Sequence, residues 1–184
     1  MVKKIKEYNI GFKGLKNGLH TFKYTVNKDF FALFESALYE NGNSEVTVNL
    51  TKSEQMLILD FDINGTIESV CDHCLEEVNM PINCQSRLYV NFGEEYDEPS
   101  EEIIILPHAE HEINVARFIY DVIATSLPIK HVHGLDQKGK STCNPEMVNK
   151  LSEYLVDQEP GADDSEEEID PRWDELKKLL DKNK

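Results

Sequence analysis

The sequence predicts an α+β fold, in which helices pack on a mostly antiparallel, curved sheet or partial barrel. Apolar residues alternate with polar residues in successive runs between residues 5 and 106, which is typical of half-buried strands. These runs follow one another through turns rather than through helices, which favours antiparallel hairpins over parallel crossovers. Strong helical spacing of apolar residues is confined to segments 28–39 and 114–127 and to the C-terminal part of the chain.

Length and composition are those of a globular protein. The 184 residues are 40% hydrophobic and 29% charged, and a chain of this size buries enough surface to fold without disulfides. No run of about 18 apolar residues predicts a membrane helix, and no apolar stretch follows the N-terminal lysines to predict a secretory signal. We therefore expect a cytoplasmic protein without membrane contact, whose four cysteines are reduced and available to a metal.

The N-terminal part predicts a strand pair followed by a helix. Segments 5–12 and 19–26 alternate like strands, and the glycines of 14–18 supply a turn between them. Asn27 suits a helix N-cap, because its side-chain oxygen can accept a free backbone N–H. The helix is expected over 28–39, with one apolar stripe formed by Phe30, Phe31, Phe34 and Leu38.

A long hairpin is predicted next. Segment 45–51 alternates, and so does 56–70, in which Gly65 is expected to mark a bulge or a bend. The motif Cys71-Asp-His-Cys74 follows, and a further extended run continues over 82–92. The two cysteines are therefore expected at the tip of this hairpin.

The remaining segments predict a loop, a short strand and two helices. Segment 94–102 predicts an acidic, mobile loop, and 103–106 predicts a short strand. Asn114 is expected to cap a helix over 114–127. A second helix, over 145–156, begins at a proline, which is favoured at the first helical position.

The expected organisation is one domain with two appendages. The α+β domain covers 1–156, an acidic flexible linker covers 157–169, and a short C-terminal helix covers 170–184. The linker has too few apolar residues to order itself, whereas the last segment places Trp173 and several leucines on one helix face.

Charge is distributed unevenly along the chain. The whole chain carries −16, but residues 1–28 carry +6. The acidic body would repel phosphates, which excludes nonspecific coating of nucleic acid. Two interpretations stay open, since the basic end either offsets the acidic body or makes a local RNA contact. The residues expected to contact RNA or a partner are Lys3, Lys4, Lys13, Lys16, Lys130, Lys138, Lys140, Arg172 and Trp173.

The C-x-x-C motif indicates zinc. Two thiolates three residues apart on a tight turn can bind one ion at about 2.3 Å, whereas a redox dithiol needs a helix N-terminus after its first cysteine. A tetrahedral structural site requires two further ligands, and the candidates are Cys84, His73, His131, His133 and Cys143.

We select His133 and Cys143 from these candidates. They flank a loop rich in glycine and lysine, which is flexible enough to close on an ion held by another segment. Cys84 alternates among core positions, and His73 is expected to point away. The prediction is a structural zinc knuckle made of Cys71, Cys74, His133 and Cys143. The alternative is four unrelated residues, with both histidines of the loop exposed.

Three strings lie in order along the chain: CDHCLEEVNMPINCQSRLYVNF, INVARFIYDVIATSLPIKHVHG and IDPRWDELKKLL. In this order and spacing they resemble the YceD family, the large ribosomal RNA subunit accumulation proteins. The family motif C-x-R-C-L corresponds to Cys71, Cys74 and Leu75, with His73 in place of arginine. The motif L-P-[MI]-K corresponds to residues 127–130, and D-P-R-[FW]-x-x-L-x-x-L corresponds to residues 170–179.

The resemblance also bears on the ligands. In typical members a cysteine follows three residues after the lysine of L-P-[MI]-K, and here that position is His133, which is also a zinc ligand type. Cys143 stands nearest to the cysteine-proline step of many members. The resemblance thus implies one four-ligand site and leaves no ligands for a second.

The function that the resemblance implies is that of an accessory factor in large ribosomal subunit biogenesis. It would support accumulation of large-subunit ribosomal RNA by binding, with ribosomal RNA or large-subunit ribosomal proteins as partners. No enzymatic activity and no small-molecule substrate are expected. Two alternatives stay open, a protein-binding adaptor without RNA contact and a zinc-dependent hydrolase. The second lacks support, because the chain contains no H-E-x-x-H, G-x-S-x-G or P-loop motif.

Overall fold

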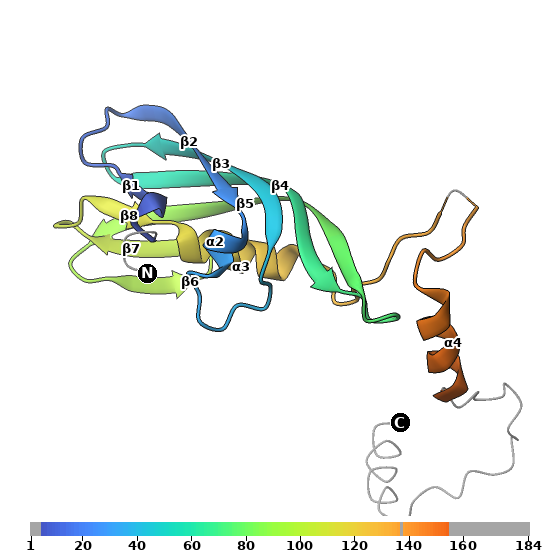
Figure 1. The fold of residues 1–184 in the computed structure, drawn as a ribbon. Helices are drawn as coiled ribbons and strands as arrows, with labels where there is room; N and C mark the ends of the chain where they lie inside the picture. Colours follow the sequence, from blue (N-terminus) through green and yellow to red (C-terminus); the bar gives the residue numbers. More distant parts are fainter. Residues whose placement is uncertain (1–4, 137, 155–184) are drawn as a thin grey trace, which may run out of the picture. The chain divides into compact units, whose positions relative to one another are not determined.

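The computed structural model describes residues 5–136 and 138–154 (Figure 1). The chain divides into two units, Met1–Asn149 and Lys150–Lys184. The predicted segments 157–169 and 170–184 lie outside the described residues. The elements in chain order are η1 (Lys6–Tyr8), β1 (Asn9–Gly11), β2 (Gly18–Val26), α2 (Lys28–Phe31), β3 (Gly42–Lys52), β4 (Met56–Val70), β5 (Glu77–Gly93), β6 (Asp97–Ser100), β7 (Ile103–Pro107), β8 (Glu112–Asn114), α3 (Ala116–Ser126) and α4 (Pro145–Tyr154).

The predicted α+β class with a mostly antiparallel sheet is confirmed. A six-stranded sheet has the order β2-β3-β4-β5-β7-β6, and a separate two-stranded sheet pairs β1 with β8. Every pair is antiparallel except β5 with β7, which run parallel. The large sheet is open, with β2 and β6 at its two edges, so the strands do not close into a barrel. The β4–β5 hairpin extends beyond the other strands (Figure 1).

The expected pairing of segment 5–12 with 19–26 is wrong. β1 pairs with β8, more than 100 residues away, so that Ile10 lies opposite Ile113. β2 pairs instead with β3 over nine residue pairs, from Gly18 opposite Lys52 to Val26 opposite Ser44. The longer partner offers more ladder hydrogen bonds, and β1 buries Ile10 in a second layer.

The helix expected over 28–39 is much shorter. Asn27 caps α2 as predicted, because its Oδ1 accepts from the backbone N–H of Phe30 at 3.2 Å. The helix ends at Phe31, and the chain continues through turns. Phe34 still packs, since its ring lies 4.5 Å from that of Tyr120, but Leu38 is 75% exposed. Aromatic contacts rather than helical spacing therefore decide where this segment turns.

Gly65 does not mark a bulge. It lies in register between Ser44 of β3 and Ile82 of β5. Its φ is +153°, and an added Cβ would lie 2.3 Å from the carbonyl oxygen of Asn43. Only glycine allows the central strand to approach its neighbour so closely here.

Segment 94–102, expected as a mobile loop, contains the edge strand β6. Asp97 lies opposite Ile105, and Ser100 lies opposite Ile103, with an irregularity in register between them. The short strand predicted at 103–106 is confirmed as β7. Because β7 follows β5 in parallel, the chain must cross back along the sheet, and β6 forms on that return path.

The predicted helix over 114–127 is confirmed as α3. Its apolar side packs on the large sheet, where the ring of Phe118 lies 4.6 Å from that of Phe61, and Ile119 and Ile123 are fully buried. Asn114 lies one residue before the N-cap position, yet its Oδ1 accepts from the backbone N–H of Ala116 at 3.1 Å.

The second predicted helix begins at Pro145, as expected, and is described as far as Tyr154. No helix within the described ranges has the length and apolar character that crossing a bilayer requires.

Candidate metal centre

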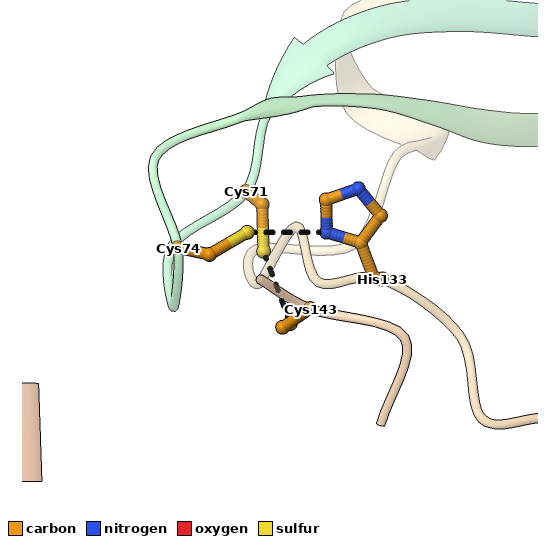
Figure 2. A group of neighbouring side chains, drawn as sticks. All are labelled: Cys71, Cys74, His133 and Cys143. Carbon is orange, nitrogen blue, oxygen red and sulfur yellow. Dashed lines mark hydrogen bonds between the residues drawn. The ribbon is translucent and has the colours of Figure 1, made fainter. Parts of the chain in front are cut away.

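Four side chains meet where the tip of the β4–β5 hairpin approaches the loop after α3. They are Cys71, Cys74, His133 and Cys143, here called the Cys/His cluster, and one ligand atom of each lies within 4.8 Å of all the others. The three cysteines are at most 7% exposed. Figure 2 shows that two come from the hairpin tip and two from the loop. These are the four residues that the sequence selects.

The separations within the cluster fit tetrahedral coordination. Cys71 Sγ lies 3.7 Å from Cys143 Sγ, and Cys74 Sγ lies 3.4 Å from His133 Nδ1 (Figure 2). Around one zinc ion with bonds of about 2.0–2.3 Å, tetrahedral geometry separates two sulfur ligands by about 3.8 Å and a sulfur from a nitrogen by about 3.5 Å. These two separations thus agree with coordination of one ion, and all four ligand atoms lie within 4.8 Å of one another.

Backbone N–H groups lie around the Cys71 sulfur atom and affect the pKa of its thiol. Burial raises the pKa of the Cys71 thiol, but N–H groups of Cys74, His73 and His133, together with the His133 ring, outweigh burial and lower that pKa to about 6. The thiolate is the form that binds metal. Burial raises the pKa of the Cys74 thiol, backbone N–H groups of Asn144 and Glu76 oppose this rise, and the neighbouring thiols of Cys71 and Cys143 add to it. A cation between these sulfur atoms would offset that cost.

The orientation of the His133 ring is set by a second hydrogen bond. Its Nε2 lies 3.1 Å from the backbone carbonyl oxygen of Glu77. A carbonyl oxygen can only accept, so Nε2 carries the proton and Nδ1 keeps its lone pair. That lone pair faces the sulfur atoms. Such an outer hydrogen bond is the usual partner of a metal-binding histidine.

The loop between His133 and Cys143, expected to be flexible, has hydrogen bonds among its described residues. Asp136 Oδ1 accepts from the backbone N–H groups of Lys138 and Lys140, each at 2.8 Å. Leu135 and Ser141 form a β-bridge. The two ends of this turn are thereby drawn together by its own hydrogen bonds. An aspartate whose side chain accepts from the backbone N–H two residues later is a known turn signal. The sequence could therefore have indicated this turn.

Further contacts, which the sequence did not predict, join the loop to the hairpin tip. Asp72 donates its backbone N–H to the His131 carbonyl at 2.7 Å, and its carboxylate accepts the His131 backbone N–H at 2.7 Å. The His131 ring lies 2.6 Å from Ser69 Oγ. On the other side, Asn144 donates to Glu76 at 2.6 Å. These hydrogen bonds form only when folding brings two distant segments together, so local sequence patterns do not predict them.

The remaining ligand candidates lie outside the cluster. His73 is exposed on the C-x-x-C turn, and His131 makes the contacts just described. Cys84 of β5 lies opposite Ile63 of β4 and packs against the core, as expected.

The described lysines that were expected to contact RNA lie at two ends of β4. Lys13 and Lys16 are exposed near the β3–β4 turn, where Lys52 Nζ donates to the carbonyl oxygens of residues 12 and 15 at 2.8 Å. The other end holds the exposed side chains of Lys130, Lys138 and Lys140. β4 spans about 45 Å between these ends, so the two groups do not form one surface. Lys3, Lys4, Arg172 and Trp173 lie outside the described residues.

The larger part of the chain is similar to a known protein family. A family model described as Large ribosomal RNA subunit accumulation protein YceD matches residues 59–180, which is more than half of the chain. The matched region begins in β4 and includes all four residues of the Cys/His cluster. No curated protein and no solved structure matches the chain.

Proposed function

The chain belongs to the YceD family of large ribosomal RNA subunit accumulation proteins, and on this premise we propose that it is an accessory factor in large-subunit biogenesis that acts by binding rather than by catalysis. The family description supports the ribosomal role. The closed arrangement of the Cys/His cluster is the observation that supports binding. The partners, in this proposal, are ribosomal RNA or large-subunit ribosomal proteins in the cytoplasm.

The Cys/His cluster, in this proposal, holds a structural zinc ion. Three thiols and one imidazole form a donor set that suits zinc, and their separations of 3.7 Å and 3.4 Å agree with its bond lengths. A bound ion supplies a cross-link between two segments that are about 60 residues apart. Cys71 and Cys74 hold it from the hairpin tip, while His133 and Cys143 hold it from the loop.

Burial of the cluster supports a structural rather than a catalytic role. Catalytic zinc keeps one position open for water and has a base nearby. Here four protein ligands would complete a tetrahedral shell around the ion. The two groups that a hydrolase would draw on are already engaged, because the Asp72 carboxylate accepts the His131 backbone N–H and the His131 ring is bonded to Ser69. We therefore favour binding over hydrolysis.

The surface beside the cluster carries the proposed RNA contact. Lys130, Lys138 and Lys140 are exposed, and the Asp136 carboxylate fixes the backbone at two of them. Cross-linking the loop to the hairpin would hold these lysines in place at the outer end of β4. Pre-positioned lysines lose less entropy when they meet phosphates than lysines on a free loop.

The ribosomal role and the zinc site can be tested with His133 variants. Cells that lack this protein should show a lowered ratio of large- to small-subunit ribosomal RNA, and the wild-type chain should restore it. His133→Cys should keep near-stoichiometric zinc in elemental analysis and restore the ratio, because cysteine is also a zinc ligand. His133→Ala should lose zinc and fail to restore the ratio. An unchanged ratio in cells without the protein would contradict the ribosomal role, and a zinc-free wild-type protein would contradict the site.

The kind of partner can be tested by a pull-down with and without nuclease. Loss of ribosomal components after nuclease treatment is expected if the lysines contact RNA, and this association should weaken steeply with salt. Changing the three lysines beside the cluster to glutamine should reduce it, whereas Lys13→Gln with Lys16→Gln should leave it nearly unchanged. Association that survives both nuclease and high salt would favour the adaptor without RNA contact.

A further inference from the structure

A groove lies beside α3, over the part of the large sheet that this helix leaves uncovered. Its volume is about 670 Å³. α3 packs on β5, while β7 and β6 lie beyond that strand at the edge of the sheet. One wall of the groove is therefore a helix face, the other is an edge strand, and the floor is the sheet between them.

The two walls of the groove are formed by side chains of β6 and α3. On the strand side, Glu98 and Ser100 of β6 line the groove, at the place where the register between β6 and β7 is irregular. On the helix side, Arg117, Asp121 and Thr125 are spaced by four residues and share one face. Both walls thus belong to secondary-structure elements of the described fold.

The floor is apolar and belongs to the core. Leu88 is 1% exposed, and Ile104, Phe118 and Val122 are half-buried and pack against the same core cluster. All four line the groove. An apolar floor of this kind favours a ligand that carries an apolar side chain of its own.

The rim is acidic. Four carboxylates line it, those of Glu98, Glu101, Glu102 and Asp121, against a single cation, Arg117, among the described lining residues. Burial raises the pKa of Asp121, Arg117 opposes this rise, and the negative charges of Glu98 and Glu101 add to it. The carboxylates thus repel one another across the groove, and a cationic ligand would relieve that repulsion.

We propose that this acidic groove binds a lysine- or arginine-rich segment of a partner protein, with an apolar side chain of that segment seated on the floor. Charge complementarity identifies the occupant, because the carboxylates repel nucleic acid phosphates and attract a basic chain. The apolar floor favours a polypeptide over a bare polyamine, which has no side chain to bury. The groove is separate from the Cys/His cluster and its lysines, so this inference goes beyond the proposed function and does not depend on zinc.

Binding of labelled peptides to the purified full-length chain tests the proposal. A lysine-rich peptide that contains leucines should bind with a measurable anisotropy change. The variant that combines Glu98→Gln, Glu101→Gln and Asp121→Asn should raise its Kd about tenfold at low salt. Arg117→Gln should lower the Kd, because it removes the one cation of the rim. Circular dichroism of each variant shows that it is folded.

Matched controls separate the groove from the general acidity of the chain. A variant that combines Glu45→Gln, Glu54→Gln and Glu68→Gln removes equal charge from exposed positions outside the groove and should change the Kd by less than about twofold. Equal weakening by both triple variants would overturn the proposal, since attraction would then follow net charge alone. Equal binding of a peptide with serines in place of leucines, or of spermidine, would overturn the role of the floor and with it the polypeptide occupant.

Discussion

His133 shows how one backbone carbonyl can decide the chemistry of a side chain. The Glu77 carbonyl oxygen, 3.1 Å from Nε2, leaves the Nδ1 lone pair free to face the sulfur atoms of Cys71, Cys74 and Cys143. A histidine whose ring was free to flip would present either nitrogen and would lose affinity for an ion. The residue type was apparent from the sequence, but the choice of nitrogen depends on the position of β5.

Among the glycines of the described residues, Gly65 leaves the least room for an added side chain. An added Cβ would lie 2.3 Å from the Asn43 carbonyl oxygen and 2.5 Å from Ser44 Cα, at a φ of +153°. Neither backbone atom can move without opening the β3–β4 ladder. We predict that Gly65→Ala lowers the free energy of unfolding by about 3 kcal/mol, as measured by denaturant titration.

Gly14 provides the control for that substitution. It is exposed, lies in a turn, and has no atom within 4 Å of an added Cβ. Gly14→Ala should change the free energy of unfolding by less than about 1 kcal/mol. If both variants lost the same stability, the close approach at Gly65 would not be the reason for its glycine.

At the scale of elements, the hairpin tip and the loop after α3 are joined twice. The Cys/His cluster joins them through side chains, and hydrogen bonds between Asp72 and His131 join them independently. The loop is further ordered by Asp136. Neither set of contacts involves the β3–β4 ladder or the aromatic core, so the two regions can lose order separately.

We predict that removing zinc from the purified protein with a chelator loosens residues 129–143 without unfolding the domain. Bringing the hairpin tip and the loop together costs loop entropy. A bound ion would offset this cost at that contact and not elsewhere in the sheet. Amide hydrogen exchange should rise in 129–143 and 71–76 and stay unchanged in β3 and α3. Cys71→Ser should reproduce this pattern. Loss of protection throughout the sheet would contradict a local role and would make the ion essential to the fold.

At the scale of the whole molecule, the acidic groove and the exposed lysines beside the Cys/His cluster lie at separate places. The acidic groove is floored by Leu88, which lies opposite Leu59, whereas Lys130 adjoins His131, which is hydrogen-bonded to Asp72 just past Val70 at the end of β4. About 35 Å of β4 separates these two positions. In a chain with a net charge of −16, the proposed phosphate contact and the proposed contact with a basic protein segment would therefore use separate places.

A second property of the whole molecule is the dependence of its free energy of unfolding on pH above about pH 10. The rings of Tyr8 and Tyr24 stack 5.2 Å apart. Burial raises the pKa of Tyr24 to about 12, with Tyr8 as the second cause, and burial also raises the pKa of Tyr8. A tyrosine that holds its proton more tightly when folded contributes stability that is complete below about pH 10 and is lost as pH rises to about 12.

We predict that the wild-type protein loses more stability than Tyr24→Phe between about pH 9.5 and pH 11.5. The phenylalanine ring keeps the stacking on Tyr8 but has no proton to lose. Denaturant titrations across this range, with tyrosinate absorbance followed in parallel, measure the difference. Parallel stability curves for the two proteins would show that Tyr24 does not ionise at the expense of the fold.

Short-range patterns in the sequence were sufficient for several elements. Alternation of apolar residues predicted β3 and β4, the C-x-x-C motif was correctly placed at a hairpin tip, and one apolar stripe predicted α3. In each case the information lies within a few neighbouring residues, because side-chain direction repeats every two residues in a strand and about every 3.6 in a helix. Asn27 was likewise predictable, since an N-cap acts on the next turn of the chain.

The sequence by itself therefore determined the class of the fold, the identity of the four cluster residues and the family. Only the tertiary structure decided that β1 pairs with β8, that α2 stops at Phe31, that β6 forms the edge of the sheet and that an acidic groove opens beside α3. These features depend on contacts between segments that are distant along the chain, and the free energy of such contacts comes from packing and burial rather than from local preference. The same reason explains the candidate metal centre. Its residue types are apparent from the sequence, but its ligand atoms lie within 4.8 Å of one another, with two pairs at 3.7 and 3.4 Å, only because the sheet and the loop bring them together.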